Sequence, residues 1–398
     1  MKEQKLVALL LTSLIVFNGC TSNGDNSNSS NTSTKIEETN SSTSLLDEEF
    51  EVTFVLNNGE SNVKRTVEAG TKIVTPGFAT KQYYEIEGWY TDEACTLRKW
   101  NFNYDYVTED MTLYAKWTVD FDDWIWRLAR IASKQTVMYM VYHYKTEDHW
   151  KNGTPDGSGA GSGVVIAKEK DPLDNKTYFY ALTNNHVVSY AEGEQNGDNN
   201  EHMVKTYKDV IHVYDHYNNK FSGELIAKTN KYDLALVRFE NIPISIGHWS
   251  DVTNDPEVGI KIAEFDDEDP GAFYDVAAYG APLAQPHVCT IGNVKDEYVY
   301  GTISKKPDGV SYITDFKVIE HTADILGGNS GGPLFGPDLK LVGINYGSSG
   351  ASDTYNTSDR FWAIPISKVK EFIRDRDNYL VNDVFADRFE FLDEIAKA

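Results

Sequence analysis

Alternation of apolar and polar side chains marks the first structured segment of the chain. Residues 51–56 place an apolar side chain at every second position, which is typical of a strand with one buried face. Residues 57–59, Asn-Asn-Gly, follow directly and favour a tight turn. The pattern predicts a β-strand that ends in a turn.

Two largely apolar segments, residues 178–183 and 232–239, predict buried strands. His186 follows the end of the first run, so a strand would hold it at a fixed, partly exposed point that suits a base near neutral pH. Asp233 stands at the head of the second run, where a buried carboxylate could orient an imidazole.

A helical pattern begins near residue 119 and continues to residue 136. Trp124, Leu128 and Ile131 form an apolar stripe, and Asp120 or Asp122 is placed to cap the helix. We expect this helix to pack against the following domain. Elsewhere aromatic and β-branched strand patterns dominate, which predicts a mainly β protein.

The chain is strongly acidic, with a formal net charge of −24 over 398 residues. This charge argues against nucleic acid as a partner and against charge-driven binding to anionic lipid. The acidic cluster at residues 266–269 lacks the spacing of a calcium loop, so we interpret it as solvated.

Cysteine and glycine patterns exclude several cofactors. The three cysteines have no partner spacing for zinc, and Cys95 and Cys289, which fall in different predicted domains, are expected to be free thiols. The glycine-rich segment 157–163 lacks the ending of a phosphate loop. We therefore expect no metal and no cofactor.

Small residues surround one serine in segment 327–333, Gly-Gly-Asn-Ser-Gly-Gly-Pro. Such a turn suits a nucleophile, because the backbone N–H groups of Gly328 and Ser330 can point together and stabilise an oxyanion. Ser330 needs a base, and His186 with Asp233 supplies the required types in the order His, Asp, Ser. The alternative is that Ser330 lies in an ordinary loop and that Asp233 only caps a strand.

These patterns resemble the chymotrypsin-fold serine peptidases, particularly their bacterial HtrA-like branch, over about residues 130–375. The resemblance rests on five segments: 161–166, 183–188, 233–237, 328–334 and 341–347. It implies a double six-stranded β-barrel, with His186 as general base, Asp233 as its partner and Ser330 as nucleophile. The remaining histidines stand in no comparable frame: His143, His149, His202, His212, His216, His248, His287 and His321.

Departures from the family affect activation and specificity. Asn329 replaces the aspartate that pairs with a new N-terminal amine in zymogens, so we expect no activation by N-terminal cleavage. Asp324 stands where trypsin-like members attract Lys or Arg side chains, although it could also cap a loop. Asn345 occupies the place of a histidine in glutamate-specific relatives, which argues against glutamate preference. The resemblance thus assigns four residues to the substrate pocket: Asp324, Asn345, Tyr346 and Gly347.

The region after the predicted barrels is short. Residues 367–398 carry a polar helical pattern and cannot bury a second core, so the PDZ domain usual in HtrA-like enzymes is not expected there. Two alternatives to a serine endopeptidase stay open. One is a surface adhesin that uses the barrel as a binding scaffold, and the other is an esterase with the same triad.

The N-terminus predicts secretion and lipid attachment. Lysines precede an apolar run too short to span a membrane, and residues 1–19 are expected to be a signal peptide. Cys20 resembles the lipidated cysteine of a bacterial lipobox, although an ordinary secreted protein is the alternative. Residues 20–47, rich in Ser, Thr and Asn, predict a flexible tether.

Residues 48–118 form a separate predicted unit with a Gly-Trp-Tyr segment and a terminal Leu-Tyr-Ala-Lys-Trp segment. They resemble the Listeria–Bacteroides repeat, which implies a small β-grasp-like module that serves either as a spacer or in adhesion. Residues 119–398 complete the chain as the peptidase domain with its C-terminal helix. We expect protein or peptide substrates and anchoring at the extracellular face of the bacterial membrane; release from the surface and oligomeric state stay open.

Overall fold

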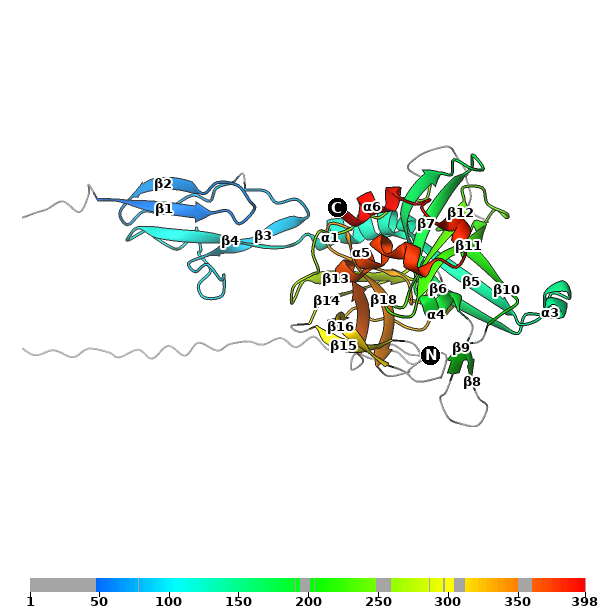
Figure 1. The fold of residues 1–398 in the computed structure, drawn as a ribbon. Coiled ribbons are helices and arrows are strands. Elements are labelled where there is room, and N and C mark those ends of the chain that lie inside the picture. Colours follow the sequence, from blue (N-terminus) through cyan, green and yellow to red (C-terminus); the bar gives the residue numbers. More distant parts are fainter. Residues whose placement is uncertain are drawn as a thin grey trace, which may run out of the picture. The chain divides into compact units, whose positions relative to one another are not determined.

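A computed structural model describes residues 48–77, 79–189, 191–193, 201–203, 205–247, 259–285, 287–295, 298–303, 312–349 and 360–397 (Figure 1). The predicted signal peptide and the predicted tether, including Cys20, therefore lie outside the described residues. Unit Glu49–Ala398 is compact and contains all the helices and strands that are described.

The N-terminal module is a four-stranded sheet in the order β2-β1-β4-β3. Its strands are β1 (Glu49–Val55), β2 (Val63–Glu68), β3 (Tyr84–Tyr90) and β4 (Met111–Val119). The first and last strands run parallel at the centre, as expected for a β-grasp-like module. Phe54 and Trp89 meet edge to face at 5.1 Å in its core. Trp89 and Trp100 are buried in this core and Trp117 packs against it, so the module's tryptophans pack internally.

The predicted helix at 119–136 is present as three consecutive helical pieces. These are α1 (Phe121–Arg127), the π-helical turn η1 (Leu128–Ala132) and α2 (Ser133–Gln135). Asp120 is the cap, because its side chain accepts a hydrogen bond from the N–H of Asp123 at 3.1 Å. Trp124 and Leu128 are buried, which confirms the apolar stripe.

The first barrel is closed and has six strands in the order β10-β11-β12-β7-β6-β5. They are β5 (Thr136–Tyr144), β6 (Gly157–Lys170), β7 (Thr177–Thr183), β10 (Lys208–Tyr214), β11 (Lys220–Thr229) and β12 (Leu234–Glu240). Four short elements lie between these strands in the chain: the helices α3 (Glu147–Lys151) and α4 (Asn185–Val188), and the strands β8 (Ala191–Gly193) and β9 (Glu201–Met203) of one hairpin. The inward side chains of β7 and β12 are almost entirely apolar, so both predicted buried strands are confirmed.

The second set of strands forms a seven-stranded sheet in the order β14-β13-β17-β18-β19-β16-β15. The strands are β13 (Asp275–Gly280), β14 (Val288–Asn293), β15 (Val299–Ile303), β16 (Tyr312–His321), β17 (Pro333–Phe335), β18 (Leu341–Ser349) and β19 (Arg360–Pro365), with the 3₁₀ turn η2 (Pro282–Ala284). A bridge between Val294 and His321 joins the β14 side to β16. Six strands thus curl into the second barrel, and β15 extends it as a hairpin.

The C-terminal region is helical, as predicted, but it is not one helix. It contains α5 (Ile366–Arg374), the 3₁₀ turns η3 (Arg376–Tyr379) and η4 (Asp383–Phe385), and α6 (Phe391–Lys397) (Figure 1). Phe385 and Phe389 are buried in the large core, so the chain breaks its helix to insert these rings. In the acidic cluster, Asp267 and Glu268 are exposed, and Asp269 accepts hydrogen bonds from Ser367 at the start of α5.

Candidate active site

His186 and Asp233 form the polar centre of the candidate site. Asp233 is fully buried, and its Oδ2 lies 2.7 Å from Nδ1 of His186. The second carboxylate oxygen accepts a hydrogen bond from the backbone N–H of His186 at 3.0 Å. The carboxylate therefore fixes both the tautomer and the orientation of the imidazole.

The local backbone explains this pairing. His186 lies in α4, immediately after β7, and Asp233 immediately precedes β12, the neighbouring strand. Asp233 has a φ of +54°, a left-handed conformation uncommon outside glycine. Its carbonyl oxygen accepts hydrogen bonds from Asn184 Nδ2 at 2.9 Å and from the N–H of Asn185 at 3.0 Å. Two asparagines before the histidine thus hold the strained aspartate in place.

Contact with an aspartate does not by itself distinguish His186. Nδ1 of His143 lies 2.8 Å from Asp209, and Nδ1 of His149 lies 2.8 Å from Asp156. What distinguishes the His186 pair is the complete burial of its carboxylate and its position next to the glycine-rich serine turn.

The turn around Ser330 depends on glycine. Gly328 has a φ of +103°, and a Cβ at this position would lie 2.5 Å from the carbonyl oxygen of Ala281. Gly331 has a φ of +84°. The N–H of Asn329 donates to the carbonyl of Leu326 at 2.9 Å and closes the turn. Only glycine fits the two flanking positions without strain.

Close packing places the serine turn beside the histidine. A Cβ on Gly331, the neighbour of Ser330, would lie 2.2 Å from Thr183 Oγ1 and 2.9 Å from the N atom of Asn184. A Cβ on Gly161 would lie 2.5 Å from the side chain of Val187 and 3.1 Å from the carbonyl oxygen of Ser330. The structure therefore brings the neighbourhoods of Ser330 and His186 together at the junction of the two barrels.

Ser162, on β6, connects the barrels behind the turn, and the sequence did not single it out. Its buried hydroxyl donates to the carbonyl of Gly328 at 2.7 Å and accepts from the N–H of Ala281 at 2.8 Å. Its own N–H donates to the carbonyl of Ser330 at 2.8 Å. In the sequence, Ser162 is marked only by the glycines on either side of it, and this pattern does not indicate which distant residues its hydroxyl contacts.

The two backbone N–H groups predicted to bind the oxyanion are not used to hold the turn together. Within the described residues, no hydrogen bond takes the backbone N–H of Gly328 or of Ser330. The carbonyl of the preceding Gly327 accepts from the N–H of Leu283 at 2.8 Å, which ties the turn to η2. The turn is thus held from behind while these two donors remain available for an oxyanion.

The four residues assigned to the substrate pocket have different environments. Asp324 is half-buried, and its carbonyl oxygen accepts a hydrogen bond from Thr290 Oγ1 at 2.7 Å. Asn345 is fully buried, and its side-chain amide donates to the carbonyl oxygen of Pro333 at 2.9 Å. Asn345 therefore braces the strand that follows the serine turn.

Tyr346 and Gly347 complete that set. Tyr346 is almost fully buried and stacks on Trp362 at a centroid distance of 6.2 Å. Burial, with a smaller effect of the charge of Asp233, raises the pKa of Tyr346. Gly347 leaves open space where a Cβ would stand.

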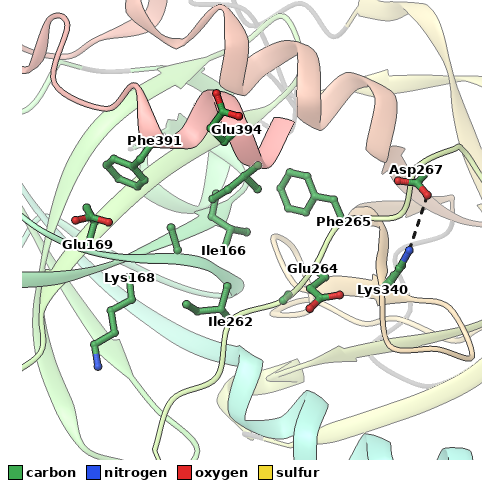
Figure 2. Close-up of a pocket in the computed structure, with 13 residues that line it drawn as sticks. Ile166, Lys168, Glu169, Ile262, Glu264, Phe265, Asp267, Lys340, Phe391 and Glu394 are labelled. Carbon is green, nitrogen blue, oxygen red and sulfur yellow. Dashed lines mark ion pairs between the residues drawn. The ribbon is translucent and has the colours of Figure 1, made fainter. Parts of the chain in front are cut away.

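A separate cavity of about 570 Å³ lies among β6, residues 262–267 and α6 (Figure 2). Ile166, Phe265 and Phe391 give it an apolar lining, and an ion pair at 3.9 Å joins Lys340 to Asp267 at its edge. None of the proposed catalytic residues lines this cavity. Within the described part of the chain, no three His, Cys, Asp or Glu side chains are grouped to hold a metal ion.

Comparison with known proteins gives two family matches. Residues 161–344 match the trypsin-like peptidase domain, and residues 50–116 match the Listeria-Bacteroides repeat domain. The two matches fall on the barrels and on the N-terminal sheet respectively.

Individual relatives match one part or the other. The serine protease Do-like HtrA of Bacillus subtilis is 29% identical over 214 residues, which cover 54% of this chain and 38% of the relative. The glutamyl endopeptidase of Staphylococcus aureus is 24% identical over 211 residues, 52% of each chain. A putative membrane protein of Evansella cellulosilytica is 38% identical over 72 residues, 18% of this chain and 11% of the relative.

The closed barrel and the second set of strands have the architecture of the chymotrypsin-like fold, and the trypsin-like peptidase match falls on them. Residues 161–344 carry a trypsin-like peptidase domain, and residues 50–116, before the barrels, carry a Listeria-Bacteroides repeat domain. Among the helices of the described residues, none has the length and apolar character needed to cross a membrane.

Proposed function

We propose that this chain is a serine endopeptidase whose nucleophile is Ser330. The observation that carries the proposal is the 2.7 Å contact between His186 and the fully buried Asp233, beside the glycine turn that holds Ser330. The relatives named as HtrA, as DegP-like endoproteases and as a glutamyl endopeptidase support peptide-bond hydrolysis as the reaction.

The chemical steps follow from the assigned roles. Ser330 Oγ forms a bond to the carbonyl carbon of the peptide while its proton passes to His186. Asp233 stabilises the resulting imidazolium, and the N–H groups of Gly328 and Ser330 bind the oxyanion. His186 then returns the proton to the leaving amine as the C–N bond breaks. Water, deprotonated by the same histidine, hydrolyses the acyl-enzyme and releases Ser330.

Covalent labelling with a fluorophosphonate probe tests the proposal. The wild-type chain should be labelled, and Ser330→Ala should lose the label, because the oxygen of an activated serine displaces fluoride from the probe and forms a phosphonate ester. Since Asn329 cannot pair with a new N-terminal amine, labelling should need no prior trimming and show no lag.

Ser348→Ala, which changes an exposed β18 residue, is the matched control and should be labelled like the wild type. A folded wild-type chain that takes no label would refute the peptidase assignment and leave the barrel as an adhesive scaffold. Cleavage of ester but not peptide substrates by a labelled chain would favour an esterase.

We further propose that Asp324 attracts basic side chains of the substrate. It stands at the position that carries the acid in trypsin-like members, and a desolvated carboxylate there would pair with Lys or Arg. Asp324→Asn should lower kcat/KM for Lys and Arg substrates by roughly tenfold or more while changing Ala and Leu substrates little.

Asp315→Asn removes an exposed carboxylate from β16 and is the matched control, which should keep the wild-type preference. If the wild-type enzyme cleaves Lys and Arg substrates no faster than Ala or Leu ones, the basic pocket is wrong. The measurement is a set of kcat/KM values on peptides that differ only in the residue before the cleaved bond.

We also propose that the enzyme works at the bacterial cell surface, anchored by a lipid on Cys20. Relatives named as periplasmic endoproteases and as membrane proteins are consistent with the cell envelope. The repeat domain would then act as a spacer or an adhesion module between the anchor and the barrels.

A further inference from the structure

A second cavity, of about 370 Å³, collects positive charge on an otherwise acidic molecule. Arg130, Lys134 and Lys261 line it together with His216 and Trp126. None of the described residues that line it is acidic, whereas the whole chain carries a net charge of −24. A positive cluster is unusual on so acidic a chain, and it is suited to an anionic ligand.

Two elements hold the cations in fixed positions. Trp126, Arg130 and Lys134 are spaced four residues apart along the helical segment α1–η1–α2, which places them on one side. The guanidinium of Arg130 lies 5.1 Å from the ring centre of Trp126. The N–H of Lys261 donates to the carbonyl of Lys134 at 3.0 Å, so the third cation is tied to the same segment.

His216 supports an anion rather than a metal ion as the ligand. Its Nδ1 lies 3.2 Å from Nδ1 of His287, a spacing that a transition metal could bridge. The pKa of His216 is nevertheless lowered to about 4, by burial and then by the positive charges of His287 and Lys134. The three basic side chains that line the cavity repel a divalent cation and attract an anion.

Trp126, which lines the cavity, belongs to a helix that carries further exposed apolar side chains. Phe121, Ile125 and Trp126 lie on the outer side of α1 and are 44%, 52% and 53% exposed. Aromatic and aliphatic residues beside Lys and Arg are the combination found where proteins contact the interface of a membrane. A small soluble anion would make no contact with these apolar side chains, whereas a lipid would.

We propose that this cavity binds the phosphate group of an anionic phospholipid, with Ile125 and Trp126 entering the interfacial layer. Arg130, Lys134 and Lys261 would surround the phosphate oxygens, and His216 would offer a neutral hydrogen-bonding group. The overall negative charge repels an anionic bilayer, so contact depends on this one basic site. The proposal is independent of the peptidase assignment and of the lipid on Cys20.

Vesicle co-sedimentation tests the proposal on a chain that begins at residue 20 and carries Cys20→Ser, which keeps unit Glu49–Ala398 intact. The protein should sediment with vesicles of phosphatidylcholine and phosphatidylglycerol and not with phosphatidylcholine alone. The double variant Arg130→Gln/Lys261→Gln should bind about tenfold or more weakly, since each basic residue near an anionic surface contributes to binding.

The matched control is Arg374→Gln/Lys317→Gln, which removes the same charge from exposed positions elsewhere. It should bind like the parent, and an equal loss in both double variants would overturn the site. Thermal unfolding midpoints of all variants verify folding. If inorganic phosphate raises the unfolding midpoint of the parent but the parent does not bind phosphatidylglycerol vesicles, the ligand is a free phosphate and not a lipid. If the parent responds to neither phosphate nor these vesicles, the proposal is overturned.

Discussion

Asp233 shows how one residue carries both strain and chemistry. A left-handed backbone costs an ordinary residue about 1–2 kcal/mol, and Asp233 adopts it at φ +54°. Hydrogen bonds from Asn184 and Asn185 to its carbonyl oxygen offset part of that cost. In return both carboxylate oxygens reach His186. The preorganised pair is what the proposed reaction requires.

His321 gives the protein a predicted sensitivity to acid. It is fully buried on β16, and neither ring nitrogen makes a hydrogen bond of ordinary geometry within the described residues. Burial lowers its pKa from 6.5 to about 3. Below about pH 6.5 the unfolded chain takes up a proton that the folded chain refuses, so stability falls as pH decreases toward 3.

The free energy of unfolding should decrease by about 1.4 kcal/mol per pH unit for this group. Denaturant unfolding at pH 7 and pH 5 measures it. His321→Gln should flatten the dependence, because glutamine does not titrate between pH 5 and pH 7. Equal slopes for wild type and His321→Gln would show that His321 does not titrate in this way.

At the scale of elements, β6 supports the serine turn across the barrel junction. Ser162→Ala would leave the carbonyl of Gly328 and the N–H of Ala281 without their partner, at a cost of about 1–3 kcal/mol. Because the proposed oxyanion donors lie in that turn, kcat should fall while KM changes little.

Steady-state kinetics on a peptide substrate check this prediction. Ser158→Ala, on the same strand but exposed, is the matched control and should behave like the wild type. A variant at Ser162 with wild-type kcat would mean that the turn keeps its geometry without the bridge. Parallel changes in KM and kcat would point to a general loss of folded protein.

The helices were predictable where their periodicity was simple. The stripe of Trp124 and Leu128 and the cap at Asp120 were recognisable, because both are local patterns. The π-helical turn at Leu128–Ala132 and the break between α5 and α6 were not. Both depend on which side chains the barrels accept, and Phe389 is buried only because a core exists to receive it.

At the scale of the whole molecule, the two folded modules follow a predicted anchor. Cys20→Ala should abolish incorporation of labelled palmitate and move the enzyme from the membrane fraction to the medium, because the thiol is the proposed attachment point. Metabolic labelling followed by fractionation measures both effects.

Cys289→Ala, which removes an exposed thiol of the barrel, is the control and should keep the label and the membrane association. If Cys20→Ala still incorporates palmitate, the lipid is attached elsewhere. If the wild-type protein incorporates none and is found in the medium, the chain is an ordinary secreted protein.

The sequence by itself determined the class of fold, the two modules and the candidate triad, because these depend on local patterns and on three short segments in a fixed order. Only the tertiary structure decided how Ser162 braces the turn, how Asn345 is used inside the barrel and where the cations of α1–α2 gather. These contacts join residues far apart in the chain, and no local pattern specifies such pairs. The physical reason is that packing, rather than propensity, selects which distant polar groups satisfy one another.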